Sequence, residues 1–301
     1  MLRRFFSRSN LLGYLFVGPW LLGFLAFTLG PFVWSFVLSL TNWDMINPPK
    51  VVGMTNYLTL FTNDPLFFQS LKVTFIFVAV HVIGIQVIAL ALALVLNQKL
   101  KGIAIYRTLF YMPSVTAGVA TALLWAQVFS QRGGLINTTL GLLGIDGPAW
   151  LFDPGYALPA LILMSLFAPG AAMIIYLAGL QGIPQHIYDA ASVDGANSWR
   201  RFWHVTVPML TPTIFYNVVV TIISSFQSFV SAFVITNGGP VNSTLFYVLY
   251  LYRQAFESFR MGYASALAWV LFLILLTFTL IQFALARKWV YYEGASGKGV
   301  I

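Results

Sequence analysis

Long runs of apolar residues, separated by short polar stretches, form the dominant pattern along the chain. A helix needs about 20 apolar residues to cross the hydrocarbon core of a bilayer. Six segments are long enough, and they lie at about residues 11–40, 67–97, 105–130, 156–180, 208–236 and 262–286. The pattern therefore predicts an all-α, polytopic membrane protein with six transmembrane helices, organised as a single membrane domain over residues 1–301.

Two of the predicted spans contain a neighbouring proline and glycine. Gly30-Pro31 is expected to kink or shorten the first helix, because proline removes a helical hydrogen bond. In the fourth span, Pro169-Gly170 either exposes backbone groups to a cavity or simply kinks the helix. The first apolar run is too long for the core of a signal peptide, so we expect it to be retained as a span.

The composition supports a membrane protein and provides little for catalysis. Of the 301 residues, 59% are hydrophobic and 8% are charged, whereas about 25% are charged in soluble domains. The lack of cysteine excludes disulfides and thiol chemistry, and His81, His186 and His204 do not have metal-ligand spacing. We therefore expect a protein that is not an enzyme and has no metal site of its own.

Lysine and arginine are distributed unequally between alternate loops. The net charge of +8 could suggest nucleic acid, but in a membrane protein a basic excess usually marks cytoplasmic loops, so no nucleic-acid partner is expected. One side of the six spans carries Arg3, Arg4, Arg8, Lys99, Lys101, Arg107, Arg200, Arg201, Arg287, Lys288 and Lys298. The other side carries only Lys50, Lys72, Arg132, Arg253 and Arg260. This bias predicts that both termini and the loop at 181–207 are cytoplasmic.

No charged side chain falls well inside a predicted span, and Arg107 lies at an edge. Charged residues within a bilayer usually mark proton relays or ion sites. Their absence argues against a secondary transporter or channel working alone, and weakly against a strongly anionic cargo. A structural membrane scaffold is a further alternative, which is distinguished by whether transport fails when the chain is deleted.

The polar stretch "GIPQHIYDAASVDGANSWRRFWHVTVP" at 182–208 interrupts this apolar chain. Pro184 suits a first helical turn, Asp194-Gly195 can end a short helix, and Ser198 is a candidate N-cap for a second one. We expect a helix–turn–helix along the membrane surface. Ile187 and the two alanines that follow it leave a face without bulk, which suits insertion into a groove of another protein. The alternative is an amphipathic helix resting on lipid headgroups.

The most polar stretch within a span is "TIISSFQSFVSAF" at 221–233. Its polar residues recur at helical spacing, so most of them are expected to share one face as candidate substrate contacts. These candidates are Ser224, Ser225, Gln227, Ser228 and Ser231. An equally weighted alternative is that the serines bond to their own helix or allow close packing.

The stretch "DAASVDGANSWRRFWHVTVP" resembles the EAA motif of permease subunits in binding-protein-dependent ABC importers. That motif reads Glu-Ala-Ala, three residues, Gly, nine residues, Ile-x-Leu-Pro. The matching positions here are Asp189, Ala190, Ala191, Gly195, Val205, Val207 and Pro208, with Asp replacing Glu and Val replacing Ile and Leu. Four further segments resemble sugar-type permeases, namely "VVGMTNY" (51–57), "YRTLFYMPSVTAGVATALLW" (106–125), "TNGGP" (236–240) and "YRQAFESFRMGYASALAWVL" (252–271).

The resemblance implies the architecture of a type I ABC importer permease in a prokaryotic cytoplasmic membrane. The loop at 181–207 is then a coupling loop that docks on an ATPase subunit. The residues implied in this docking are Asp189, Ala190, Ala191, Asp194, Gly195 and Pro208. In maltose-type relatives the part of the span around Ser224, Ser225 and Ser228 contributes sugar contacts.

The same resemblance implies a set of partners. They are a second, homologous permease, two cytoplasmic ATPase subunits that hold ATP and magnesium, and an extracytoplasmic solute-binding protein. The implied cargo is a neutral sugar, with an oligosaccharide favoured. Glycerol 3-phosphate or a polyol is the alternative cargo within the family.

Overall fold

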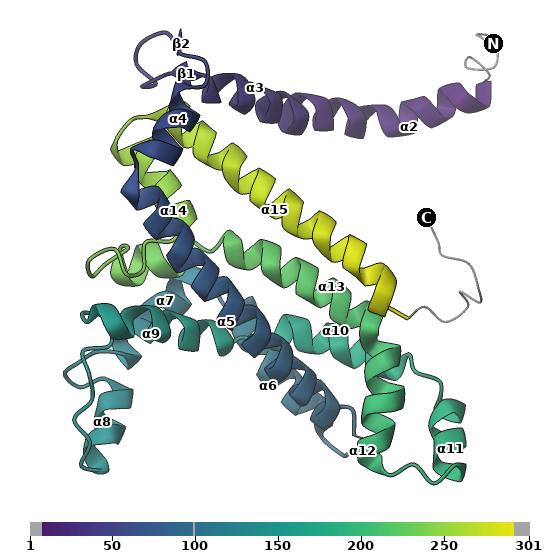
Figure 1. Ribbon diagram of the computed structural model, residues 1–301. Helices are drawn as coiled ribbons and strands as arrows, with labels where there is room; N and C mark the ends of the chain where they lie inside the picture. The colour runs from purple at the N-terminus through teal and green to yellow at the C-terminus, as the bar shows by residue number, and fades with distance from the viewer. Residues whose placement is uncertain (1–7, 99, 292–301) are drawn as a thin grey trace. The chain divides into compact units, whose positions relative to one another are not determined.

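The computed structural model describes residues 8–98 and 100–291, and these are almost entirely helical (Figure 1). Within them, the strands are limited to a two-stranded antiparallel pair, β1 (Thr41–Asn42) and β2 (Lys50–Val51). The all-α prediction is therefore confirmed. Four residues that contribute to the charge bias lie outside the described residues, namely Arg3, Arg4, Lys99 and Lys298.

Four continuous helical runs are long and apolar enough to cross a membrane. They are Leu15–Ser39, Pro65–Leu96, Ser198–Phe226 and Met261–Trp289. Two bent helix pairs bring the total to six if each pair is one span: α6 (Ile103–Val115) with α7 (Gly118–Val128), and α9 (Pro154–Leu166) with α10 (Gly170–Gln181). Six predicted spans thus correspond to four continuous helices and two bent ones among the described residues.

The chain divides into two compact units, and α15 (Met261–Trp289) runs from one into the other. The first unit contains the residues described up to Asp64, together with residues 251–273. Its helices are α2 (Arg8–Phe24), η1 (Leu25–Leu29), α3 (Gly30–Ser39), α4 (Thr55–Thr62), η4 (Arg253–Glu257) and the start of α15. In this unit, Trp269 of α15 packs between Phe32 and Phe36 of α3, with ring centroids 4.7 and 4.9 Å apart.

A π-helical turn precedes a proline in two of the long helices. The turn η1 comes before Pro31, and η2 (Phe202–Thr206) comes before Pro208. Each turn closes with a bond from residue i to i−5, which widens the helix where proline cannot donate and its ring would meet a carbonyl. The first span therefore continues through Gly30-Pro31 to Ser39 instead of ending there.

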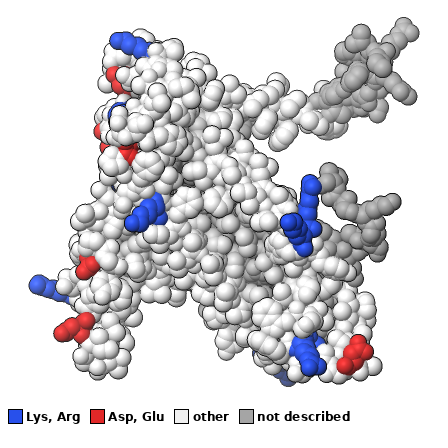
Figure 2. All heavy atoms as spheres, in the orientation of Figure 1, with Lys and Arg blue, Asp and Glu red and all other residues white. Residues whose placement is uncertain are grey.

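The second unit is built around α5 (Pro65–Leu96), which packs against α10 and α13 (Val207–Phe226). Ala89 and Ala93 of α5 contribute small side chains to this packing, and small residues let helices approach closely inside a membrane. The buried cluster consists of Ala89, Ala93, Leu96, Met173, Tyr176, Leu177, Leu180, Ile183 and Leu210. On the face shown in Figure 2, charged side chains are few and most of the visible surface is uncharged.

The third predicted span, 105–130, is bent by 96° between α6 and α7. The bend lies at Thr116-Ala117, where Thr116 has an extended backbone. Pro113 weakens the last turn of α6 by removing one helical hydrogen bond. The segment predicted as the third span is therefore a bent helix pair and not one continuous helix. After the bend, α7 packs on η3 (Ala232–Thr236), and Gly118 at its start lies near Val230.

The fifth predicted span, 208–236, differs at both ends. It begins earlier, since α12 (Ser198–Arg201), η2 and α13 form one continuous helix from Ser198 to Phe226. It is then interrupted at 227–229 before a short helical segment that includes η3 (Ala232–Thr236). The expected continuous helical face through this span is therefore corrected to two helical segments separated by a break.

Candidate functional site

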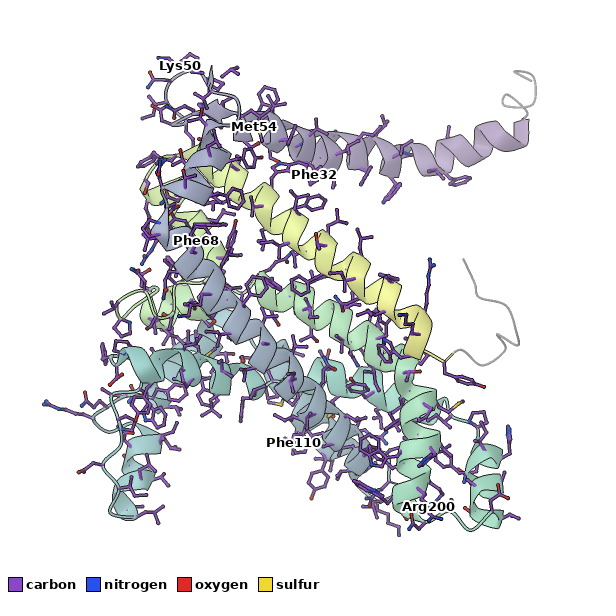
Figure 3. The ribbon with its side chains drawn as sticks, viewed as in Figure 1. Phe32, Lys50, Met54, Phe68, Phe110 and Arg200 are labelled. Carbon is purple, nitrogen blue, oxygen red and sulfur yellow. The ribbon has the colours of Figure 1, made fainter. Side chains whose placement is uncertain are left out.

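The loop between α10 and α12 is an exposed helical arm. Its helix, α11 (Gln185–Val193), contains no buried residue, and the side chain of Val193 is 87% exposed. Figure 1 shows α11 beside α12 at one end of the second unit, and Figure 3 places Arg200 at that end. This arm is the most accessible part of the predicted coupling segment.

The turn after α11 is set by the backbone of one glycine. Gly195 has φ +76°, which L-amino acids with a side chain rarely adopt. The Ala196 N–H donates to Ala191 O at 2.9 Å, and the Gly195 N–H donates to Ser192 O at 3.1 Å. These two bonds form a Schellman motif, which closes the C-terminal end of a helix. The sequence signal Asp-Gly was therefore read correctly as the end of this helix.

The next helix begins one residue earlier than expected. The side chain of Asn197 accepts a hydrogen bond from the Arg200 N–H at 2.9 Å, so Asn197 is the N-cap. The prediction of Ser198 as N-cap was wrong, because Asn is an equally good cap and fits the turn that Gly195 creates. Since α12 continues into the fifth span, the expected separate second helix along the membrane surface is also incorrect.

The arm is attached to that long helix by side-chain hydrogen bonds. Arg201 Nη1 donates to Ser192 Oγ at 3.1 Å, and the hydroxyls of Tyr188 and Thr206 lie 3.0 Å apart. These contacts join α11 to the start of the continuous helix from Ser198 to Phe226.

The outer side of the arm contains most of the residues that the EAA resemblance implicates. Asp189, Ala190, Asp194 and Gly195 are exposed, whereas Ala191 is half-buried. The side chain of Asp189 accepts from Gln185 Nε2 at 3.2 Å. Pro208 does not belong to this surface, because it lies half-buried in the first turn of α13.

The five candidate substrate contacts fall on both sides of the break in the fifth span. Ser224 is exposed, and Ser225 is buried; their hydroxyls donate to Thr221 O at 3.0 and 2.6 Å. The serine hydroxyls of this helix end therefore bond to their own helix, as the alternative interpretation expected for such serines.

Gln227 is the C-cap residue of α13, and its side chain is exposed. Ser228 and Ser231 are half-buried. Nearby, Phe229 and Phe233 form a stacked pair with ring centroids 5.0 Å apart. A helix break inside a membrane is tolerated where the backbone is covered by protein or faces a cavity. The break therefore presents polar and aromatic groups together, although not on one continuous helical face.

A cleft of about 1000 Å³ lies elsewhere in the same unit, between α6, α7, α8 (Leu135–Leu142) and the end of α9. None of the five candidate residues lines it. Its wall is mainly apolar and includes Trp125 and Phe167, with Thr116, Thr121 and Gln127 among the polar groups. Sequence reasoning missed these residues because their polar positions are scattered over three helices and converge only after the 96° bend.

Metal chemistry has no support in the part of the chain that is described. Those residues contain no group of three or more His, Asp or Glu side chains able to hold a metal ion. His81 instead lies with Nδ1 2.7 Å from Ser165 Oγ, which links α5 to α9. This contact agrees with the hydrogen-bonding role expected for the histidine.

Several membrane-length helices, two bent helix pairs and an exposed helical arm are features typical of a membrane transport protein. The chain belongs to the family described as binding-protein-dependent transport system inner membrane components, whose model matches residues 24–291. Its role as a permease subunit of an ABC importer follows from this membership.

Similar proteins cover nearly the whole chain. The probable ABC transporter permease protein YesP of Bacillus subtilis is 46% identical over 96% of this chain and 95% of that protein. The lactose transport system permease protein LacF of Rhizobium radiobacter is 38% identical, over 92% and 94%. The arabinooligosaccharides transport system permease protein AraP of Bacillus subtilis is 32% identical, over 94% and 91%.

The fold is also that of a solved transporter subunit. A chain in the crystal structure of a bacterial ABC transporter that imports the acidic polysaccharide alginate has a TM-score of 0.82. It is 23% identical, and the match covers 93% of this chain and 96% of that chain. At this identity the likeness establishes the fold, and the predicted ABC importer permease architecture is confirmed.

Proposed function

We propose that this chain is one of two membrane-spanning subunits of an ATP-driven importer for a sugar, with a neutral oligosaccharide as the favoured cargo. The observation that carries this proposal is membership of the permease family over residues 24–291. The sugar is supported by the relatives named for lactose and arabinooligosaccharide transport.

The exposed arm is the proposed contact with an ATPase subunit. Its outer side combines two small residues, Ala190 and Ala191, with the carboxylates Asp189 and Asp194. Small side chains allow a helix to enter a groove closely, and the carboxylates offer acceptors to donors at its rim. ATP and magnesium are then bound by two cytoplasmic ATPase subunits, which places the arm and both termini on the cytoplasmic side.

The continuous helix from Ser198 to Phe226 provides a route from that contact to the membrane interior. A displacement of the arm is transmitted to this helix by the hydrogen bonds of Arg201 and Tyr188. The helix then transmits the displacement to the break that follows Phe226. We place the sugar contacts at this break, with Gln227, Ser224 and Ser228 as hydrogen-bonding groups and Phe229 as a stacking surface. An external solute-binding protein delivers the sugar, and a second permease completes the cavity.

The charge distribution favours a neutral cargo. In the described membrane-length helices, charged residues stay near the ends, and Arg107 is used within the fold, where Nη2 donates to Leu96 O at 2.8 Å. The break itself, residues 227–229, carries no charged side chain to bind a phosphate or carboxylate. A sugar ring and its hydroxyls match the amide, hydroxyl and aromatic groups that are present.

The decisive experiment uses the complex purified with the products of neighbouring genes and reconstituted in lipid. We would measure ATP hydrolysis with the solute-binding protein and a panel of mono-, di- and oligosaccharides, with glycerol 3-phosphate included. The expected result is stimulation by one neutral sugar.

Two other outcomes would count against the proposal in different ways. Stimulation by glycerol 3-phosphate alone would contradict the neutral cargo. Failure of any ATPase subunit to co-purify would contradict the role of the arm. Gln227→Ala should raise the sugar concentration for half-maximal uptake, whereas Leu142→Ala, on the exposed part of α8, is the matched control.

A further inference from the structure

Three polar side chains meet inside the helical bundle of the second unit. Gln86 on α5 accepts a hydrogen bond through Oε1 from the Tyr176 hydroxyl on α10, at 2.6 Å. Through Nε2 the same side chain donates to Thr221 Oγ1 on α13, at 2.9 Å. We call Gln86, Tyr176 and Thr221 the Gln86 clamp.

The three side chains of the clamp are buried to different degrees, and Gln86 and Thr221 are half-buried. Tyr176 is 1% exposed and belongs to the buried apolar cluster of α5, α10 and α13. Asn217, which is 2% exposed, lies one turn before Thr221 on α13 and donates to Ala172 O at 3.5 Å. Away from water, a polar group that loses its partner pays a desolvation penalty, so these bonds favour one arrangement of the three helices.

The clamp joins both helices that flank the exposed arm. The helix α10 precedes the arm in the chain, and α13 belongs to the continuous helix from Ser198 to Phe226 that follows the arm. Gln86 lies on neither of them, and it bonds to one with its carbonyl and to the other with its amide. Because both hydroxyls can donate or accept, the amide bridges the two helices in either of its two orientations.

Apolar packing alone does not determine this register. Contacts between aliphatic side chains in a membrane are non-directional, whereas interhelical hydrogen bonds have one preferred geometry. Between α10 and α13 the packing is close, since a Cβ on Gly179 would lie 2.6 Å from Thr213 Oγ1. The clamp adds α5 to this pair and fixes all three helices against sliding.

The clamp is also close to the break in the fifth span. Thr221 lies on the last turns of α13, which ends at Phe226. The hydroxyls of Ser224 and Ser225 both donate to the Thr221 carbonyl. The backbone of Thr221 therefore supports the residues just before the break, while its side chain holds the clamp.

We propose that the Gln86 clamp is a set of positioning residues that makes α5, α10 and α13 move as one body when the arm is displaced. A displacement of the arm is then transmitted to the break at 227–229, because the three helices do not slide past one another. The clamp does not contact the sugar and acts through the helices. This inference rests on the proposed function and assigns its transmission step to three residues.

The test compares near-isosteric variants in the reconstituted complex: Gln86→Leu, Tyr176→Phe and Thr221→Val. For each we would measure sugar imported per ATP hydrolysed, together with the melting temperature and subunit composition. Because an interhelical hydrogen bond in a membrane is worth a modest free energy, we expect sugar per ATP to fall about threefold for each bond lost. Hydrolysis should continue, since the ATPase contact is unchanged.

Non-additivity separates a clamp from general loosening. In the Gln86→Leu background, Tyr176→Phe and Thr221→Val should cause no further fall in sugar per ATP, because their shared partner is already gone. The matched control is Ser165→Ala, which removes the bond from His81 of α5 to α9, a helix that does not flank the arm. The control should keep the stoichiometry of the unmodified complex.

Either of two results would overturn the inference: an assembled Gln86→Leu complex with unchanged sugar per ATP, or a Ser165→Ala complex that is equally uncoupled.

A second measurement does not depend on the cargo. The chain has no cysteine, so spin labels at Val193→Cys and Val230→Cys report the distance between the arm and the break. With the clamp intact, the distribution of this distance should stay narrow with and without ATP. In the Gln86→Leu variant the distribution should broaden.

The two measurements keep this inference separate from the proposed function. If no sugar stimulates the unmodified complex, the proposed cargo fails, and the spin-label distances still decide the clamp. A Gln86→Leu complex with an unchanged, narrow distance would then overturn the clamp alone.

Discussion

Individual residues determine how the exposed arm is held, and Gly195 is the clearest case. Its φ of +76° completes the Schellman turn, and nothing lies within 4 Å of where a Cβ would be. A side chain here would therefore be strained by the backbone and not by crowding.

Gly195→Ala is expected to destabilise the turn by about 1 kcal/mol, which is the cost of a left-handed conformation for a residue with a Cβ. Hydrogen exchange at the Ala196 amide should accelerate about fivefold, because this amide closes the turn. Gly182→Ala is the matched control, since Gly182 has an ordinary φ of −77°. Equal exchange in both variants would show that the turn does not depend on Gly195.

A second prediction concerns Asp44 in the turn between β1 and β2. Its Oδ1 accepts from the N–H groups of Ile46 and Asn47, at 3.0 and 2.8 Å, and Oδ2 accepts from Asn47 Nδ2 at 2.7 Å. The backbone bond from Asn47, and then its side-chain bond, hold the pKa of Asp44 below its ordinary value of 3.8. Hydrogen bonds to the charged form favour that form.

Because the folded pKa is lowered, the turn is stabilised above pH 3.8, and the stabilisation is lost as the pH falls through the folded value. A carbon-13 titration of the Asp44 carboxyl should give a midpoint below 3.8. Protection of the Ile46 amide should fall over the same range. In Asp44→Asn this fall should be absent, and a carboxyl midpoint at or above 3.8 would contradict the assignment.

At the scale of elements, the close approach of α10 and α13 depends on Gly179. A Cβ at this position would lie 2.6 Å from Thr213 Oγ1 and 3.0 Å from Leu210 Cδ2. Two helices that both flank the arm thus meet at a residue without a side chain.

Gly179→Ala should destabilise the protein by about 1–3 kcal/mol, because the helices must separate or change rotamers. The melting temperature in lipid nanodiscs checks this, and Thr213→Ala should restore part of the loss. The control is Gly141→Ala on α8, where nothing lies within 4 Å. That change should be neutral or stabilising by up to about 1 kcal/mol, since alanine favours helix.

The elements show which features a sequence can reveal. The apolar runs predicted the four continuous helices and the two bent pairs, and Asp194-Gly195 predicted the end of α11, because hydrophobic length and a left-handed glycine are local properties. The 96° bend at Thr116-Ala117 was not predicted, since neither residue is a strong helix breaker. The break after Phe226 was also missed, because the serines and the glutamine around it recur at the spacing of residues on one face of a helix.

The site shows the same division between local and tertiary information. The residues of the arm could be identified from one continuous motif, from Asp189 to Pro208. The hydrogen bonds of Gln86 to Tyr176 and Thr221 could not be identified from the sequence. Tyr176 lies 90 residues and Thr221 lies 135 residues from Gln86 along the chain. The same holds for the cleft, whose polar side chains converge only through the bend between α6 and α7.

At the scale of the whole molecule, the remaining question is which side of the membrane each polar segment faces. The excess of lysine and arginine on one set of loops predicts that the arm is cytoplasmic and that the β1–β2 turn is external. This orientation is required by the proposed function, because ATP is available only inside the cell, whereas an external binding protein must reach the opposite side.

The absence of cysteine makes this orientation directly measurable. Val193→Cys lies on the arm and Ile46→Cys in the β1–β2 turn, and the native side chains are 87% and 84% exposed. A membrane-impermeant maleimide applied to intact cells should label Ile46→Cys alone, and it should label Val193→Cys only in inside-out vesicles. The two positions are similarly exposed in the chain itself, so labelling after the ATPase subunits have been stripped from the membrane reports sidedness and not accessibility. The reverse pattern would place the arm where no ATPase can reach it, and the importer mechanism would then be excluded.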